Sequence, residues 1–409
     1  MSRKNKKLVC IYNHFRHKIN AFKKRITKVQ RFYSLNPSRA IVKKKIEMST
    51  ANKKKSTTPQ LVSSLICRKT QFIIFCAQTN KQKSETVIKI ILQNWLRSLS
   101  IKLGWIYNFD KIIAKYAKYF QLLKIFQGHE SIVRSVRFSL DGRKIISASN
   151  DETIRIWDVA SGQQIQTFRG HSSWVHLAEY SPDKRTIVSC SYDKTIRLWD
   201  VKSGKEIKKL EGHSNMVWCV NFSPNGGDIV SCSTDKTIRL WNVGTGKEIQ
   251  QFVGHSDTVC NVQYSPNGQM IVSSSEDKTI GLWNVKSGER IKELKGHLDI
   301  VTCARFSPDG QFIVSCSWDK TIRIWNVETG KEVKILGGHR YFVTDVKYFP
   351  DGQTIISCSG DNTNRLWDVK SGNEIQRLEH SDLIRCVDVT SEGNTIVSGS
   401  GDGTIRIWE

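Results

Sequence analysis

The sequence has few of the features that mark an exported, membrane-bound or metal-binding protein. Its eleven cysteines are an odd number and form no Cys-x-x-Cys pair, so we expect reduced thiols that serve as small core residues. No apolar stretch follows the charged first residues, and no signal peptide is predicted. The longest apolar run, 61–77, is short and is broken by Arg68 and Lys69, so it is not a membrane span. These absences predict a soluble, intracellular protein of the cytoplasm or nucleus.

Acidic residues are nearly absent from the first part of the chain. Residues 1–120 hold 28 Lys and Arg against 3 Asp and Glu, a difference that equals the whole net charge of +25, whereas residues 121–409 hold 35 of each. We predict a basic, mostly disordered extension over residues 1–83, because this composition cannot bury enough apolar surface to fold. Three interpretations stay open: weak contact with nucleic acid or an anionic surface through residues 1–70, a mitochondrial transit-like segment, or a functionless tail, even a wrong start ahead of Met48.

Residues 84–120 have a helical pattern instead. Ser84 is a suitable N-cap, apolar residues follow at i, i+3, i+4 spacing as far as Leu103, and Gly104 is a natural end. Asp110 begins a second such pattern whose apolar face ends at Phe120. Two short amphipathic helices are predicted, and they must pack on each other, on the rest of the chain or on a partner. The heptad is not sustained, which disfavours a coiled coil.

From residue 121 onward, one motif recurs seven times. Each copy has His (after Gly in the first six), a Ser-Pro-Asn/Asp-Gly-like turn, Ser-x-Ser-x-Asp, and a closing Trp followed by an acidic residue or Asn. Successive closing tryptophans are 42 residues apart five times and then 41. This period, with four short strand-like segments in each copy, predicts a β-propeller. The recurring residues are His129, His171, His213, His255, His297, His339 and His380; Asp151, Asp193, Asp235, Asp277, Asp319, Asp361 and Asp402; and Trp157, Trp199, Trp241, Trp283, Trp325, Trp367 and Trp408.

The phase of the repeat predicts how the ring closes. A strand lies between each closing Trp and the next His, for example at 206–210, but only Glu409 follows Trp408. The unpartnered copy of that strand is 121–127, ahead of His129. We therefore expect this N-terminal strand to complete the last blade, which removes an open sheet edge.

Residues 121–409 resemble a seven-bladed WD40-repeat β-propeller. The resemblance implies that the His, one Ser, the Asp and the Trp of each repeat form a hydrogen-bonded cluster, in the third repeat His213, Ser231 or Ser233, Asp235 and Trp241. A buried indole N–H does need an acceptor. Seven copies, each tied to a core Trp, argue against seven catalytic triads, and no phosphate loop or metal-ligand cluster appears in the sequence. We expect a monomeric ring that is not an enzyme and has no cofactor or metal.

Three departures from the repeat are expected to affect local packing only. Gly281 stands in place of an Arg, Asn364 in place of an Ile, and Glu379 in place of the Gly before His380.

Within residues 121–409, three tryptophans fall outside the repeated Trp position: Trp174, Trp218 and Trp318. In WD40 proteins, the family that the chain resembles, their positions face the rim of the central channel. Exposed aromatic and apolar side chains at a rim are typical of protein-binding surfaces. Reading the same positions in every repeat gives the predicted partner-binding residues Ile132, Arg134, Trp174, His176, Tyr192, Met216, Trp218, Ile300, Trp318, Phe342, Leu383 and Arg385.

The leading hypothesis is a non-enzymatic scaffold that binds peptide or protein partners on this rim. An alternative is a nucleic-acid- or ribosome-associated protein that acts through the basic arm. A further alternative is a subunit resembling the β subunit of heterotrimeric G proteins, whose N-terminal helix pairs with a small partner.

Overall fold

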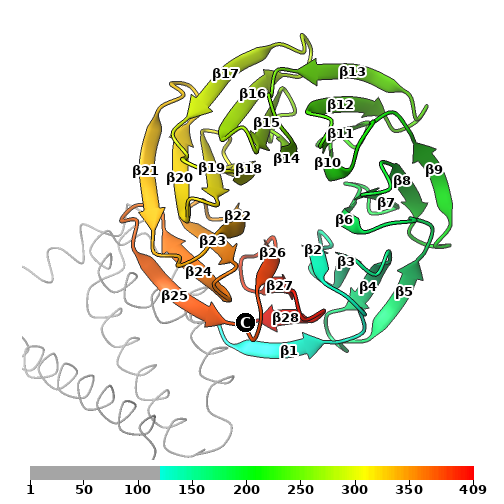
Figure 1. The fold of residues 1–409 in the computed structure, drawn as a ribbon. Coiled ribbons are helices and arrows are strands. Elements are labelled where there is room, and N and C mark those ends of the chain that lie inside the picture. The colour runs from blue at the N-terminus through cyan, green and yellow to red at the C-terminus, as the bar shows by residue number, and fades with distance from the viewer. Residues whose placement is uncertain (1–119) are drawn as a thin grey trace, which may run out of the picture. The chain divides into compact units, whose positions relative to one another are not determined.

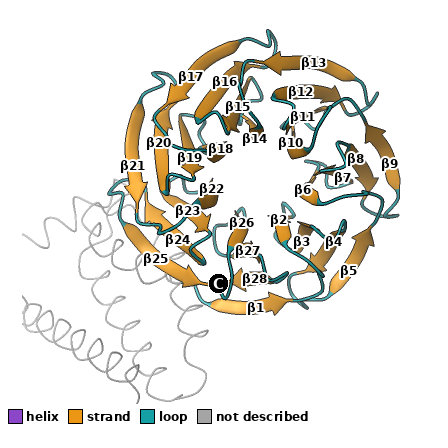
Figure 2. Ribbon diagram, in the orientation of Figure 1, coloured by secondary structure: helices purple, strands orange, loops and turns teal. Residues whose placement is uncertain are grey.

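The computed structural model describes residues 120–409, in which seven four-stranded antiparallel sheets, the blades, surround a central channel (Figure 1). Strands joined by turns and bends make up residues 120–409, and this part of the chain contains no helix (Figure 2). The prediction of an all-β, seven-bladed propeller is therefore confirmed. The basic extension predicted over 1–83 and the helices predicted over 84–120 lie outside the described residues, except for Phe120, which is not helical.

Each blade contributes one strand to each of four concentric layers (Figure 1). The innermost strands of blades 1 to 7 are β2 (Val133–Phe138), β6 (Val175–Tyr180), β10 (Val217–Phe222), β14 (Val259–Tyr264), β18 (Val301–Phe306), β22 (Val343–Tyr348) and β26 (Ile384–Val389). The second strands are β3 (Lys144–Ser149), β7 (Thr186–Ser191), β11 (Asp228–Ser233), β15 (Met270–Ser275), β19 (Phe312–Ser317), β23 (Thr354–Ser359) and β27 (Ile396–Ser400).

The third strands are β4 (Ile154–Asp158), β8 (Ile196–Asp200), β12 (Thr237–Asn242), β16 (Thr279–Asn284), β20 (Thr321–Asn326), β24 (Thr363–Asp368) and β28 (Ile405–Trp408). The outer strands are β5 (Gln164–Phe168), β9 (Glu206–Leu210), β13 (Glu248–Val253), β17 (Arg290–Lys295), β21 (Glu332–Gly337), β25 (Glu374–Glu379) and, in blade 7, β1 (Leu122–Phe126).

The core lies between neighbouring blades rather than inside any one of them. One buried cluster, for example, joins Leu198 of blade 2, Trp241 of blade 3 and Trp283 of blade 4. The second strands are buried on both faces, whereas the outer strands keep one face in solvent. Each closing Trp buries a side chain that contributes roughly 2–3 kcal/mol or more. A blade therefore depends on its neighbours for stability, as expected of a repeat architecture.

The seventh blade joins the two ends of the described chain. β1 pairs antiparallel with β28, and the backbones of Gln121 and Glu409 exchange two hydrogen bonds of 2.7 and 3.0 Å. Next to this pair, the buried Phe120 bonds Gln376 of blade 6 through both its backbone N–H and its carbonyl. In blades 2, 4, 5 and 7 a Lys at the Gln376 position, such as Lys208, reaches carbonyls in the turn after the next blade's third strand. For Gln376 the partner is instead the Phe120 backbone.

The repeated Pro-Asn/Asp-Gly turns pack against one another around the ring. Gly226 has a φ of +73°, and a Cβ there would lie 3.3 Å from Pro182 of the preceding blade. Gly268 has the same relation to Pro224. Glycine is favoured at this position for its backbone conformation, although Lys184 adopts the same left-handed conformation in blade 2 with a φ of +63°.

Candidate functional site

The recurring polar residues form a hydrogen-bonded tetrad inside the blade. In blade 3, Trp241 Nε1 donates to Ser231 Oγ at 2.8 Å, and His213 Nε2 lies 2.8 Å from the same oxygen. His213 Nδ1 is 2.8 Å from Asp235 Oδ2. Of the two candidate serines, Ser231 is thus the tetrad member, whereas Ser233 Oγ accepts a bond from the Asp235 backbone and donates to the Asn215 carbonyl.

The tetrad holds the loop before the innermost strand to the turn before the third strand. Burial alone would raise the pKa of Asp235, but hydrogen bonds from His213 and Thr237 hold it well below its usual range. Ser231 is fully buried against Trp241 and its Oγ already has two partners, so the tetrad offers no open position for a substrate. The same bonds join His129, Ser147, Asp151 and Trp157; His171, Ser189, Asp193 and Trp199; His255, Ser273, Asp277 and Trp283; His297, Ser315, Asp319 and Trp325; and His339, Ser357, Asp361 and Trp367.

The prediction of an equivalent cluster in all seven blades is wrong for blade 7. Trp408 Nε1 still donates to Ser398 Oγ, and His380 Nε2 lies 3.0 Å from that oxygen. His380 Nδ1, however, has no partner among the described residues, and Asp402 bonds Ser381 and Arg406 instead. Burial and the charge of Arg406 lower the pKa of His380 to about 3.

The altered cluster follows from the missing residue in the last repeat. His380 comes two residues after Leu378, whereas His339 comes three residues after Leu336. The fully buried Asn364, which replaces an Ile, places its Nδ2 3.1 Å from His380 Nε2. Two departures from the repeat, the shortened loop and Asn364, therefore meet at one contact.

At Gly281, an arginine from a different strand occupies the missing side chain's position. In most blades an Arg of the third strand pairs with a Glu of the outer strand, as Arg239 Nη1 does with Glu248 at 2.6 Å. Blade 4 has Gly281 and Arg290 at these two positions. Arg290 bonds Thr279 Oγ1 and the Gly254 carbonyl, and its Cζ lies 5.4 Å from the centre of the Trp283 ring. A guanidinium is thus kept beside the closing Trp.

The predicted partner-binding residues gather at one end of the channel, where the innermost strands begin. A backbone hydrogen bond joins the two key positions in every blade, for example from Trp318 N to the Ile300 carbonyl at 2.9 Å. We call this end the upper mouth. Its residues comprise three exposed side chains, Trp174, Met216 and Trp318, and nine half-buried ones, Ile132, Arg134, His176, Tyr192, Trp218, Ile300, Phe342, Leu383 and Arg385.

The aromatic side chains of the upper mouth form two separate groups. In the first, the Tyr192 ring centre lies 5.3 Å from those of Trp174 and Trp218, and His176 is 4.7 Å from Trp218. This group spans blades 2 and 3. In the second, Trp318 of blade 5 stacks on Phe342 of blade 6 at 5.4 Å. The structure thus brings most of the predicted aromatic residues together, but in two patches and not in a continuous ring.

One aromatic residue of the second group was not predicted. Tyr341 is 53 % exposed and its ring centre lies 4.5 Å from that of Phe342. It stands two residues before β22, at a position where the other repeats have Ser, Asn or Asp. An aromatic residue at that position could therefore have been recognised in the sequence as a departure from the repeat. Gly360 makes room for both rings, because a Cβ there would lie 2.7 Å from Tyr341 and 2.9 Å from Phe342.

Two arginines stand beside the first aromatic group. Arg134 donates from Nε to Asn150 at 2.7 Å, and its Cζ lies 5.2 Å from the Trp174 ring centre. The Nε of Arg385 is buried and has no partner among residues 120–409. Burial lowers the pKa of both arginines, and the charge of Arg385 lowers that of Arg134 further. Burial and both positive charges lower the pKa of His176 to about 3, so this ring is neutral at pH 7.

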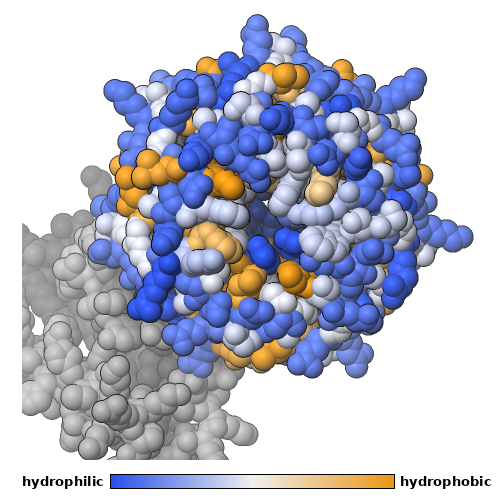
Figure 3. Space-filling model, in the orientation of Figure 1, coloured by the Kyte–Doolittle hydropathy of each residue, from blue (hydrophilic) through white to orange (hydrophobic). Residues whose placement is uncertain are grey.

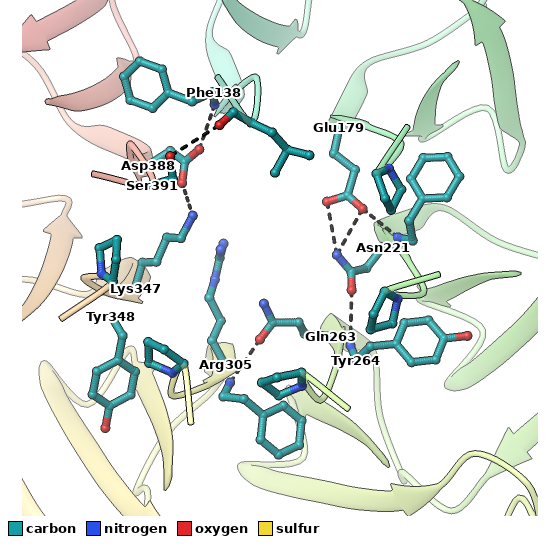
Figure 4. Close-up of a pocket in the computed structure, with 18 of the residues that line it drawn as sticks. Phe138, Glu179, Asn221, Gln263, Tyr264, Arg305, Lys347, Tyr348, Asp388 and Ser391 are labelled. Carbon is teal, nitrogen blue, oxygen red and sulfur yellow. Dashed lines mark hydrogen bonds and ion pairs between the residues drawn. The ribbon is translucent and has the colours of Figure 1, made fainter. Parts of the chain in front are cut away.

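The other end of the channel, where the innermost strands end, forms a cavity of about 670 Å³. We call it the lower mouth. Figure 4 shows polar side chains from successive blades pointing into it, while the rings of Tyr264 and Tyr348 point away. Burial, and to a smaller degree the charge of a nearby aspartate, raises the pKa of both tyrosines, so neither ring supplies a charge to this face. The polar set is Glu179, Asn221, Gln263, Arg305, Lys347 and Asp388.

These lower-mouth side chains are bonded to the protein itself. Glu179 accepts a hydrogen bond from the Phe222 backbone at 2.6 Å, and Asp388 accepts one from Phe138 N at 2.8 Å. Arg305 pairs with the buried Asp345 at 2.9 Å, and Lys347 pairs with Asp388. Each of these contacts joins one blade to another, so this polar ring ties blades together.

Metal ligands, thiols and apolar helices also bear on what residues 120–409 can do. This part of the chain holds no group of three or more His, Cys, Asp or Glu side chains placed to bind a metal ion. Its eight cysteines are buried and unpaired. Nothing in residues 120–409 has the length and apolar character of a membrane-crossing helix.

Comparison with known proteins agrees with this architecture. The WD40 family model, described as "WD domain, G-beta repeat", matches seven consecutive stretches: 120–158, 162–200, 204–242, 246–284, 288–326, 330–368 and 372–409.

Matches to individual curated proteins are short. The chain is 46 % identical over 59 residues to the vegetative incompatibility protein HET-E-1 of Podospora anserina, which is 14 % of this chain and 4 % of that protein. It is 48 % identical over 42 residues to WD repeat-containing protein 18 of Danio rerio, 10 % of each chain. It is 46 % identical over 43 residues to the small ribosomal subunit protein RACK1 of Candida albicans, 10 % of this chain and 14 % of that one. The chain thus spans only a small part of each relative.

The family model covers nearly all of residues 120–409, and each matched stretch contains one tetrad or, in the last, its altered form. The chain belongs to the WD40-repeat family of β-propellers.

Proposed function

We propose that this protein is a non-enzymatic scaffold that binds a peptide segment of a partner protein across the upper mouth. The observation that carries the proposal is the exposure of large aromatic side chains at that end of the channel. Trp174 is 43 % and Trp318 is 45 % exposed, whereas the seven closing tryptophans are at most 5 % exposed. WD40 propellers are generally protein-interaction scaffolds, and the family membership supports the proposal.

The surface around the channel has the character of a binding surface. Figure 3 shows apolar side chains in patches around the central opening of the face drawn there. Partly exposed Trp and Tyr side chains bury much area at a low cost in conformational entropy. Their backbones are held by hydrogen bonds within the blade, such as Tyr192 N to the Trp174 carbonyl at 3.0 Å. The aromatic groups are thus presented on a rigid support, which lowers the cost of binding.

The test is selection of peptides from a random phage-displayed library on the full chain. Selected peptides are synthesised, and their Kd values are measured by fluorescence polarisation on wild type and on Trp174→Ala and Trp218→Ala variants. We expect each substitution to weaken binding by about tenfold or more, as at other aromatic hot spots.

Ile249→Ala is the matched control, because Ile249 is 53 % exposed on the outer strand β13. It should leave the Kd unchanged. Peptides that bind the tryptophan variants as tightly as wild type would place the binding surface elsewhere and refute the proposal. Thermal melting of each variant excludes unfolding as the cause of a loss.

A further inference from the structure

The upper mouth contains two positive charges that no acidic side chain of the described chain balances. Arg134 and Arg385 come from blades 1 and 7 and converge on Tyr192 of blade 2. The Arg134 Cζ lies 6.0 Å from the Tyr192 ring centre. Burial raises the pKa of Tyr192, and the charges of both arginines act in the opposite direction. Among residues 120–409, Arg134 has Asn150 as its polar partner and Arg385 Nε has none.

Other buried arginines of the propeller, in contrast, have acidic partners. Arg305 pairs with Asp345 at 2.9 Å, Arg365 pairs with Glu374 at 2.9 Å, and Arg155 pairs with Asp151 at 3.3 Å. A partly buried guanidinium without a counter-charge is unfavourable, and two of them side by side also repel each other. The upper mouth is therefore an exception within this chain.

The acidic group nearest in sequence does not neutralise Arg385. Asp382 accepts a hydrogen bond from the Leu383 backbone at 2.7 Å and forms no ion pair with Arg385 in the described structure. Its effect on the pKa of Arg385 is the smallest of the causes, behind burial, Tyr192 and two cysteines.

The aromatic group lies next to the arginines and can pack against a peptide that binds there. Trp174 stacks under the Arg134 guanidinium at 5.2 Å, and the indole N–H of Trp218 is already bonded to Thr234 Oγ1 at 2.7 Å. These faces offer apolar contact directly next to cationic groups. The indole donor of Trp218 is satisfied, so a ligand need not supply a partner for it.

We propose that the upper mouth recognises an acidic side chain of the bound peptide, with Arg134 and Arg385 pairing its carboxylate while Trp174 and Trp218 pack against its apolar neighbours. This inference rests on the proposed function, because it names the chemistry of the peptide that the same surface binds.

A carboxylate fits the donors that remain. Arg134 uses its Nε on Asn150, so its terminal N–H groups are left for a ligand. The Nε of Arg385 is buried, and its terminal N–H groups form no hydrogen bond or ion pair within residues 120–409, so they too are left for a ligand. The guanidinium fork matches the two oxygens of a carboxylate, and such charge-assisted bonds are the stronger kind. His176 adds no charge at pH 7, so the site carries two positive charges, and one carboxylate leaves it with one.

The experiment uses the peptides selected on the full-length chain. Consensus peptides are made with Asp or Glu at the enriched position, with Asn or Gln in its place, and with phosphoserine in its place. Kd values are measured by fluorescence polarisation on wild type, Arg134→Gln, Arg385→Gln and the double variant. Arg143→Gln, an exposed arginine in the first turn after β2, is the control.

We expect an acidic residue at one fixed position of the consensus and a Kd about tenfold or more weaker for the amide copy on wild type. On the double variant the acidic and amide copies should bind equally, and Arg143→Gln should behave as wild type. Equal binding of both copies to wild type, or binding of the phosphoserine copy alone, overturns the inference.

The outcomes separate this inference from the proposed function. Peptides that depend on Trp174 and Trp218 but not on the arginines would sustain the scaffold and refute the carboxylate site. Peptides whose binding depends on neither the tryptophans nor the arginines would refute both the scaffold function and the carboxylate site.

Discussion

The two ends of the channel use charged side chains in opposite ways. At the lower mouth, Arg305 and Lys347 pair with aspartates of neighbouring blades. At the upper mouth, Arg134 and Arg385 find no carboxylate among the described residues. Both sets stand on innermost strands: Arg134 and Arg385 are the second residues of β2 and β26, and Arg305 and Lys347 are the fifth residues of β18 and β22. Position along the innermost strand therefore separates charges that are paired between blades from charges that have no acidic partner among the described residues.

The difference has a physical cause in the surroundings of each end. The lower-mouth side chains lie beside backbone N–H groups of the next blade, and a buried donor left without an acceptor is costly. Asp388 and Glu179 satisfy such donors. At the upper mouth, backbone hydrogen bonds within each blade already join the start of the innermost strand to the turn after the second strand. Side chains there are not needed for that purpose, and their types vary from blade to blade.

The largest difference in stability is expected between two tryptophan variants, one in the core and one at the upper mouth. Trp241→Ala removes a side chain that is 2 % exposed and leaves Ser231 without its indole donor, so we expect a loss of about 3–5 kcal/mol in the free energy of unfolding. Trp218→Ala should cost about 1 kcal/mol or less, because that ring is only half-buried. Urea unfolding followed by circular dichroism measures both, and equal losses would contradict the distinction.

Breaking a lower-mouth ion pair should come next in size. Arg305→Ala leaves the buried Asp345 with only Arg137, whose Nη1 is 3.9 Å away. We expect a loss of about 3 kcal/mol in the free energy of unfolding, because an uncompensated buried charge is strongly destabilising. Urea titration at pH 7 measures it. A change below about 1 kcal/mol would show that the lower-mouth pairs are not structural.

The pH dependence of stability should show that the upper-mouth charges share one sign. The pKa of His176 is lowered to about 3 in the folded chain by burial and by Arg134 and Arg385, from 6.5 in the unfolded chain. Between those values the unfolded chain binds a proton that the folded chain does not, so stability falls as pH falls from 6.5 toward 3. The slope contributed by one such histidine is at most about 1.4 kcal/mol per pH unit.

His176→Gln tests the pH effect, with urea midpoints measured at pH 7, 5.5 and 4.5. The slope should decrease in the variant without vanishing, because the pKa of His380 is also about 3. An unchanged slope would argue against a neutral, buried His176. Below pH 3.8 a second loss should begin in both proteins, since the tetrad aspartates have pKa values held below that value and lose their stabilising contribution on protonation.

The smallest effect is expected for an upper-mouth arginine. Arg385→Gln removes a positive charge that has no partner and that Arg134 repels, so the free energy of unfolding should change by about 0.5 kcal/mol or less, or rise. Differential scanning calorimetry measures it beside Arg305→Ala. A loss as large as that of Arg305→Ala would mean that Arg385 has a structural partner and would weaken the proposed ligand site.

The sequence predicted the parts of the site that depend on the repeat. The period and the closing tryptophans identify seven blades, and the off-pattern Trp174, Trp218 and Trp318 identify positions that the structure places at one mouth. Sequence positions did not show that the aromatic side chains form two groups, because ring contacts depend on which blades are adjacent and how each side chain turns. Tyr341 was missed because it lies outside the three positions compared between repeats.

The last repeat also shows that contacts between blades cannot be predicted from sequence positions alone. The missing residue before His380 is visible in the sequence, but its consequence is not, since the displaced imidazole finds Asn364 from the neighbouring blade's third strand. Likewise Arg290 takes the place left by Gly281 from the outer strand of the same blade. Both adjustments depend on contacts between residues that are not neighbours in the chain.

The sequence by itself determined the number of blades, the buried Trp of each and the Ser-Asp turns around it, because these follow from local spacing repeated seven times. Only the tertiary structure decided which charged groups have partners. Arg305 meets Asp345, which is 40 residues away, whereas Arg385 meets no acid in the described chain. The energy of a charge depends on what stands within a few ångströms of it, and in a ring of blades those neighbours come from other repeats.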